Sequence, residues 1–210
     1  MSQRDERWAD IPLGTRGGAT IGSHGCLLCA ASKMTAFDPG VLNRLLCRND
    51  GYTGGNRVIF SKLGELADLD TEVIECSDLP APMDRVQDVL DHDGFVLAKV
   101  DFSPGGAVQQ HWVQILGLPD GDALIYDPWL REARTCWMMP RYAHWSWDEP
   151  SRAIFRLALY TQRDKMADQG INAKKTGGSE RAQQRLPPIS KSPVSLAKQG
   201  VLSLRRLIRG

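Results

Sequence analysis

Three side chains in this sequence could together cleave an amide bond: Cys26, His111 and Asp127. Cys26 follows Gly25 and opens the run Cys-Leu-Leu-Cys-Ala-Ala-Ser-Lys-Met, which favours a helix. A helix N-terminus favours the negative charge of a thiolate. His111 lies on a later predicted strand, and Asp127 ends the strand after that. In cysteine hydrolases the thiolate attacks, the imidazole transfers the proton and a carboxylate orients the imidazole. The residue types therefore indicate nucleophilic hydrolysis.

The hairpin between His111 and Asp127 decides whether these two residues meet. Pro119-Asp120-Gly121 has Pro where a type I turn prefers it and Gly where a following bulge needs positive φ, which predicts a three-residue loop. In that register Val113 faces Asp127 and His111 faces Trp129, so His111 and Asp127 are diagonal neighbours on one face. A two-residue loop would move Asp127 to the opposite face.

The order of elements predicts an α+β fold, with N-terminal helices packed on a C-terminal antiparallel sheet. Residues 1–24 and 51–55 read as loops. We expect helices at 26–37, 39–48, 57–68 and 83–92, and strands at 72–76, 95–101, 111–118, 123–126 and 153–160.

Charge divides the chain into two parts. Residues 1–162 carry fifteen basic and twenty-two acidic side chains, whereas residues 163–210 carry eleven basic and three acidic ones. We therefore expect a folded domain over 1–162 and a basic, largely disordered tail over 163–210. Within the tail, residues 196–209 have the spacing of a short amphipathic helix.

Five cysteines without a disulfide spacing favour a reducing compartment. The N-terminus is charged and lacks the apolar core of a secretory signal, and no apolar run has the length of a membrane span. These features predict a protein that is cytoplasmic at synthesis.

Gln3 is a fourth candidate, because a glutamine amide can join the nucleophile's backbone N–H in stabilising an oxyanion. Four segments in order then resemble a known family: Gln3-Arg-Asp-Glu-Arg-Trp8, Thr20-Ile-Gly-Ser-His-Gly-Cys26, His111-Trp-Val-Gln-Ile-Leu-Gly117 and Asp127-Pro128-Trp129. Over residues 3–160 the chain resembles papain-like cysteine peptidases of the bacteriocin-leader (double-glycine) type, in the divergent branch of bacterial and phage proteins.

This resemblance implies a papain-like α+β fold, no cofactor and no metal. Cys26 would attack, His111 would be the base, Asp127 would orient it, and Gln3 would complete the oxyanion hole. The phage branch implies, by analogy, a cell-wall or protein-processing peptidase with a peptide or peptidoglycan-peptide substrate, and virion association as one location. The chain departs from the family at Cys29, where a small or hydroxylated residue is frequent, and it has no attached transporter.

Three alternatives compete with hydrolysis. Cys26-Leu-Leu-Cys29 is a Cys-x-x-Cys that could belong to a dithiol oxidoreductase, although residues 14–25 do not read as the preceding strand. His24, Cys26 and Cys29 could ligate zinc, but no second ligand pair follows. The fold could also be an inert structural or virion-associated module whose basic tail binds a partner protein, nucleic acid or a membrane surface.

An aromatic cluster follows Asp127 and comprises Trp129, Trp137, Tyr142, Trp145 and Trp147. Such residues usually belong to a core or a lid. We expect Trp129 to shield the bond between the histidine and the carboxylate from water.

Overall fold

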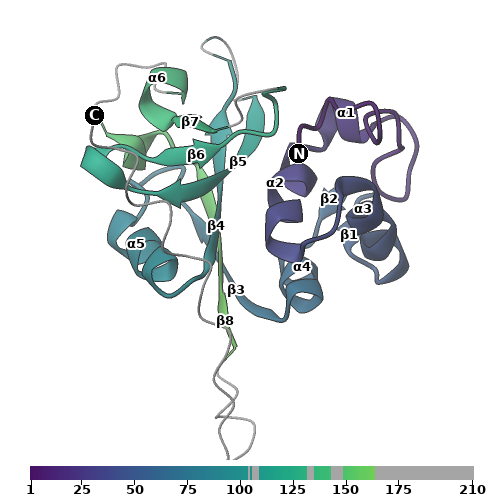
Figure 1. Cartoon of the computed structure of the whole chain (residues 1–210), viewed down its shortest axis with the longest axis horizontal. Coiled ribbons are helices and arrows are strands. Elements are labelled where there is room, and N and C mark those ends of the chain that lie inside the picture. Colours follow the sequence, from purple (N-terminus) through teal and green to yellow (C-terminus); the bar gives the residue numbers. More distant parts are fainter. Residues whose placement is uncertain (104, 106–108, 132–134, 143–148, 164–210) are drawn as a thin grey trace, which may run out of the picture. The chain divides into compact units, whose positions relative to one another are not determined.

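The computed structural model describes residues 1–103, 105, 109–131, 135–142 and 149–163 (Figure 1). They belong to a compact unit over Met1–Lys165. The predicted tail, apart from Arg163, lies outside the described residues, and so does its predicted helix at 196–209. No helix in the described part of the chain is long and apolar enough to cross a membrane.

The unit begins with helices and continues with strands. The helical segments are α1 (Ile21–His24), α2 (Cys26–Thr35), α3 (Pro39–Arg48), α4 (Phe60–Ala67), α5 (Met83–Asp91), α6 (Met138–Tyr142) and the 3-10 turns η1 (Pro119–Gly121) and η2 (Pro150–Arg152). The strands are β1 (Tyr52–Thr53), β2 (Arg57–Val58), β3 (Leu69–Glu75), β4 (Phe95–Asp101), β5 (Gln110–Gly117), β6 (Leu124–Tyr126), β7 (Thr135–Trp137) and β8 (Arg156–Gln162).

Within the described residues, six strands form one sheet in the order β3-β8-β4-β5-β6-β7, and every neighbouring pair is antiparallel. β8, the last strand in sequence, lies between β3 and β4. The short strands β1 and β2 pair separately. The predicted α+β class, with helices first and an antiparallel sheet after them, is therefore confirmed.

The sheet is covered on both faces (Figure 1). α2 packs against one face beside β4 and β5, and α5 packs against the other. Alternate residues of each strand enter the two cores: Leu97 and Trp112 join the cluster around α2, whereas Val96 and Val113 join the cluster around α5. Strands buried on both faces have long apolar runs, and β4 is such a strand.

Several predicted boundaries were wrong. Residues 1–24 are not all loop, because Thr20 and Ser23 form a capping box that begins α1. The helix predicted from residue 26 ends at Thr35, since Ala36 has a left-handed backbone with φ of 58°. The helix predicted over 57–68 begins only at Phe60, because residues 57–58 form β2.

The remaining differences concern strand ends. Residues 51–55 contain β1, which pairs with β2. β3 begins at Leu69, before the predicted residue 72, because it pairs along its whole length with β8. β8 begins at Arg156, after the predicted residue 153, since η2 and the turn that follows it occupy the preceding positions.

Candidate active site

Cys26 is the first residue of α2, and Gly25 before it caps both α1 and α2. The Gly25 N–H donates to the Ile21 carbonyl at 2.8 Å. A Cβ added to Gly25 would lie 2.5 Å from that same oxygen, so a glycine permits this close junction. The N–H groups of a first helical turn have no partner within the helix, and their partial positive charge favours a thiolate.

His111 and Asp127 meet at the ends of neighbouring strands. His111 lies near the start of β5, Asp127 follows β6, and His111 Nε2 is 2.8 Å from Asp127 Oδ1. Their side chains are only 4% and 0% exposed. Ile115 faces Ile125, as the predicted register requires. The predicted proximity of His111 and Asp127 is therefore confirmed.

The loop that produces this register differs from the prediction. Gly117 faces Leu124, so residues 118–123 connect the strands, twice the predicted length. With that connection alone, Asp127 would lie opposite Gln114, on the face away from His111. A β-bulge between Ile115 and Gly117 shifts the pairing by one residue and returns Asp127 to the correct face.

The Asp127 carboxylate accepts hydrogen bonds from four groups. His111 Nε2 and the Trp129 backbone N–H (2.9 Å) donate to Oδ1. Arg141 Nε (2.5 Å) and the Tyr142 hydroxyl (2.7 Å) donate to Oδ2. A buried carboxylate with all of these donors can remain ionised, because each of them stabilises the charged form.

Sequence reasoning missed two of the residues that surround the pair. Neither Arg141 nor Phe102 was singled out. Phe102 contacts the His111 ring edge to face at a centroid distance of 5.3 Å and the Trp129 ring at 5.0 Å. Arg141 precedes Tyr142 of the aromatic cluster, and this position was the one signal in the sequence that could have pointed to it. The contact of Arg141 with Asp127 arises only when the fold brings α6 to Asp127.

The electrostatics of the pair follow from its contacts. Burial by itself lowers the pKa of His111, but hydrogen bonds with Asp127 and with Cys26 outweigh burial and raise this pKa to about 9. Burial by itself raises the pKa of Asp127, and the hydrogen bonds from His111 and Tyr142 hold it well below its usual range. The two groups thus stabilise each other as imidazolium and carboxylate.

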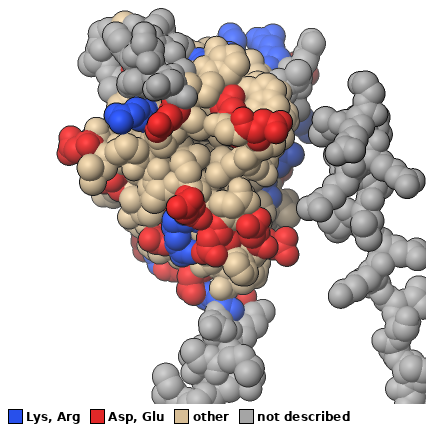
Figure 2. All heavy atoms as spheres, turned by 90° about the vertical axis from the view of Figure 1, so that its left-hand side faces the viewer, with Lys and Arg blue, Asp and Glu red and all other residues tan. Residues whose placement is uncertain are grey.

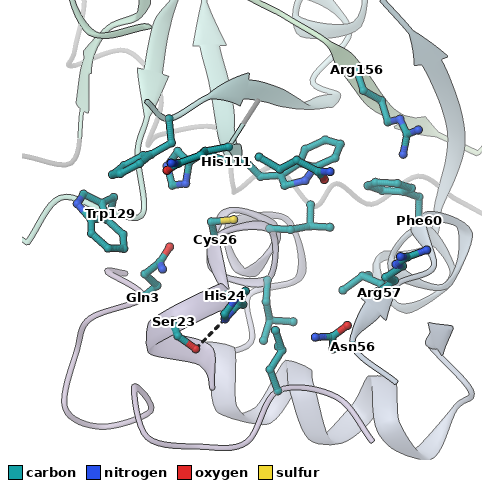
Figure 3. Close-up of a pocket in the computed structure, with 18 residues that line it drawn as sticks. Gln3, Ser23, His24, Cys26, Asn56, Arg57, Phe60, His111, Trp129 and Arg156 are labelled. Atoms are coloured by element: carbon teal, nitrogen blue, oxygen red, sulfur yellow. Dashed lines mark hydrogen bonds between the residues drawn. The ribbon is translucent and has the colours of Figure 1, made fainter. Parts of the chain in front are cut away.

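Cys26 lies close to the same ring. Nε2 of His111 is bonded to Asp127, and the interaction with Cys26 further raises the pKa of His111. Figure 3 shows His111 beside the Cys26 sulfur, with the histidine coming from the sheet and the cysteine from the helix below it. A thiol, an imidazole and a carboxylate are the three groups that thiol hydrolysis uses.

Gln3 lies at the same site and is 2% exposed. Its backbone N–H donates to the Pro128 carbonyl at 2.9 Å, and its side-chain Nε2 donates to the Gly22 carbonyl at 3.0 Å. An amide nitrogen carries two hydrogens, so one remains for another acceptor. Gln3 Oε1 is buried and has no hydrogen-bond partner among the described residues.

A cleft of about 710 Å³ is lined by Gln3, Cys26, His111 and Trp129, among other residues. Gln3 and Trp129 lie at one end of it in Figure 3, Cys26 and His111 near the middle, and Arg57, Phe60 and Arg156 at the other end. The volume is in the range of pockets that hold small ligands or several residues of a peptide.

Trp129, which we expected to shield the bond between His111 and Asp127, lies at the cleft beside that pair. The Trp129 N–H bonds Asp127, and its ring packs against Phe102 and under the Arg4 guanidinium, 4.7 Å from the ring centroid. Tyr142 is buried in the core, whereas Trp137 is 41% exposed. Trp145 and Trp147 lie outside the described residues.

Cys29 does not line the cleft in the described structure. It is fully buried, and burial raises its pKa far above that of an ordinary thiol. α2 follows α1 and not a strand, so the setting of a dithiol oxidoreductase motif is not found there. No group of three His, Cys, Asp or Glu side chains in the described part of the chain could hold a metal ion, which argues against the zinc alternative for His24, Cys26 and Cys29.

Comparisons with known proteins give little further information. No family model matches this chain, and no curated protein matches it. Among solved structures, a crystal structure described as a "putative C39-like peptidase" from Bacillus anthracis matches with a TM-score of 0.44 and 13% identity, over 74% of this chain and 96% of that chain. Similarity at this level supports no conclusion about activity.

Proposed function

We propose that this chain is a cysteine peptidase that uses Cys26, His111 and Asp127 as a catalytic triad. The observation that carries the proposal is the hydrogen bond between His111 Nε2 and the fully buried Asp127 carboxylate, with Cys26, at the start of α2, beside the same imidazole in the cleft. Structural ion pairs also perturb pKa values, but a buried histidine set between a carboxylate and a thiol at the wall of a cleft matches the requirements of nucleophilic catalysis.

In the first half of the reaction, the Cys26 thiolate attacks the carbonyl carbon of a peptide bond, with its proton held by His111. The tetrahedral intermediate collapses when the carbon–nitrogen bond breaks and the His111 imidazolium gives its proton to the leaving amine. The products of this half are a thioester on Cys26 and a free amine.

Water completes the reaction. Neutral His111 takes a proton from water, and the resulting hydroxide attacks the thioester carbonyl. The second tetrahedral intermediate breaks the carbon–sulfur bond, which releases a carboxylic acid and regenerates the thiolate–imidazolium pair. Asp127 keeps the imidazole in one orientation and stays ionised throughout.

Both intermediates carry an oxyanion, and Gln3 is suited to bind it. Two donors are proposed. One is the second hydrogen of Gln3 Nε2, which remains after the bond to the Gly22 carbonyl, and the other is the backbone N–H of Cys26, which has no partner within α2 because Cys26 is its first residue. The Gly22 and Pro128 carbonyls hold Gln3 in place through its side chain and backbone.

The finer assignments drawn from the resemblance remain predictions. They are a phage- or prophage-related role, a peptide or peptidoglycan-peptide substrate, and virion association. A partner protein, nucleic acid or membrane surface for the basic tail is a prediction from its charge alone. The catalytically inert module is the alternative that the following experiment addresses.

The test is alkylation of the full chain by iodoacetamide over a range of pH, with the modified cysteine identified by mass spectrometry. We expect selective modification of Cys26 in acid solution, where ordinary thiols react slowly, and loss of this reaction in His111→Ala. Cys29→Ala is the matched control and should keep the reaction. A Cys26 that reacts no faster than the other cysteines would favour the inert module.

A further inference from the structure

One end of the cleft is lined by cationic side chains. Arg57 of β2 and Arg156 of β8 both line the cleft, and in Figure 3 their guanidinium groups lie on either side of Phe60, away from Gln3 and Trp129. None of the described residues that line the cleft is Asp or Glu. This end is therefore suited to an anion and not to a cation.

Arg57 is available to bind a ligand. Its side chain is exposed, and no hydrogen bond or ion pair links its guanidinium to another described residue. A guanidinium offers five N–H donors in a planar arrangement that matches the two oxygens of a carboxylate. Bidentate bonds of this kind are stronger than bonds between neutral groups.

Arg156 adds a second, partly compensated charge. Its Nε donates to Glu75 of β3 at 2.6 Å. Lys99 faces Arg156 across β4 and β8, and the hydrogen bond with Arg156 together with the charges of Arg156 and Lys99 lowers the pKa of Glu75. Arg156 and Lys99 act on the Glu75 carboxylate, and Arg57 adds a further charge to the end of the cleft, which therefore retains net positive charge.

Acidic side chains gather on the opposite side of the sheet. Figure 2 views the side of the molecule that carries α5, where Asp and Glu gather over the lower part of the surface. Arg85 there is paired with both Glu72 and Asp88. Because residues 1–162 carry a net negative charge, attraction of an anion to the cleft must act over a short distance, within about one Debye length of 8–10 Å.

The wall next to the arginines is aromatic. Phe60 packs against Trp112 with 5.2 Å between ring centroids, and both residues line the cleft. The combination provides apolar contact for a peptide chain and charged donors for one of its anionic groups.

On the basis of the proposed peptidase function, we propose that this end of the cleft is a subsite for a carboxylate of the peptide substrate, bound by Arg57 with Arg156 beside it. Two sources share this chemistry: the side chain of Asp or Glu, and the free C-terminal carboxylate of a short peptide.

Binding tests the subsite without catalysis. The full-length Cys26→Ala protein is immobilised and exposed to a random library of short acetylated peptides, once with free and once with amidated C-termini, and mass spectrometry identifies the retained peptides. We expect acidic residues to be enriched at one position in the amidated library, or free C-termini to be retained over amidated ones. The first result assigns the side chain and the second the C-terminal carboxylate.

Substitutions of single arginines show which side chain causes the preference for acidic peptides. Adding Arg57→Gln to Cys26→Ala should weaken binding of the selected acidic peptide by about tenfold, while its Gln-substituted counterpart changes little, since one charged hydrogen-bonded contact of this kind is worth about 1.4 kcal/mol. Arg44→Gln, on the exposed surface of α3, is the matched control and should keep the preference. Equal binding of acidic and neutral peptides, or a preference that survives Arg57→Gln, would overturn the subsite.

Cleavage by the wild-type protein separates the two proposals. Cleavage without acidic preference would reject the subsite and leave the peptidase in place. Arg57-dependent binding of acidic peptides without any cleavage would keep the subsite and reject the peptidase. Cleavage at a fixed distance from an acidic residue would support both.

Discussion

A carboxylate with no exposed surface, such as that of Asp127, is stable as an anion only because donors surround it. The same charge keeps His111 protonated to an unusually high pH, since the pKa of His111 is raised to about 9. In the proposed reaction, the proton that His111 holds is the one that the leaving amine receives. The residues around Asp127 therefore set the pH range in which the site can work.

Asp127→Asn should shift this range. Without the negative charge the pKa of His111 falls, so the alkaline limb of kcat/KM should move from near pH 9 to lower pH. We also expect kcat to fall by about 10²-fold or more, because loss of an orienting carboxylate is costly in triads, while KM changes little. A pH–rate profile on a cleaved peptide measures both; an unchanged alkaline limb would remove Asp127 from the triad.

Tyr142→Phe removes one of the donors to Asp127 and leaves the ring in place. We expect a loss of about 1–3 kcal/mol in the free energy of unfolding, because the buried carboxylate loses a hydrogen bond. The Asp127 charge stays but has one donor fewer, so it stabilises the His111 imidazolium more strongly, and the alkaline limb should move slightly to higher pH, opposite in direction to Asp127→Asn.

Tyr160→Phe is the matched control for this experiment, since Tyr160 is equally buried but its hydroxyl, among the described residues, bonds only the Phe60 carbonyl, at 3.4 Å. Denaturant unfolding and the pH–rate profile compare the two variants. An equal effect of both on the pH–rate profile would mean that Tyr142 acts through packing alone.

At the level of secondary structure, the junction of α1 and α2 positions the nucleophile. Gly25→Ala should displace the start of α2, because the new Cβ would meet the Ile21 carbonyl oxygen and side chain. We expect a loss of about 1–3 kcal/mol in stability and a larger proportional loss of Cys26 alkylation rate. Gly17→Ala is the control, since nothing lies within 4 Å of a Cβ there. Wild-type alkylation in Gly25→Ala would show that the junction tolerates a side chain.

Elements whose boundaries depend on local signals could be predicted from the sequence. Asp38 caps α3 through its side chain, with Pro39 at the first helical position, and this helix has the predicted bounds. The face shared by His111 and Asp127 was predicted correctly although the loop was not. Both faces of β5 are buried, so no hydrophobic alternation fixes the register, and the bulge alone compensates for the longer loop.

Other features depend on contacts distant in sequence and could not be predicted. Pairing with β8 extends β3 beyond its local pattern. The approach of Arg141 to Asp127 requires α6 to fold back onto the end of β6, which no local signal specifies. Gln3 was found only through resemblance, because a glutamine near a terminus has no local signature of function.

At the scale of the whole molecule, the sheet and its two cores lie within the compact unit Met1–Lys165. Deletion of residues 166–210 should therefore leave the thermal unfolding midpoint of the remaining protein nearly unchanged, within a few degrees. Differential scanning calorimetry of the full and shortened chains makes the comparison. A drop of 5 °C or more, equivalent to roughly 1–2 kcal/mol in a domain of this size, would mean that the tail packs on the unit.

The position of β8 has a consequence for the order in which the candidate site can assemble. Synthesis proceeds from the N-terminus, so Cys26 and the hairpin that carries His111 and Asp127 leave the ribosome before β8 does. Until β8 is added, β3 and β4 have no strand between them. Under the proposed peptidase function, a nascent chain would therefore be inactive until β8 has been made, and such timing would protect neighbouring nascent proteins from premature cleavage.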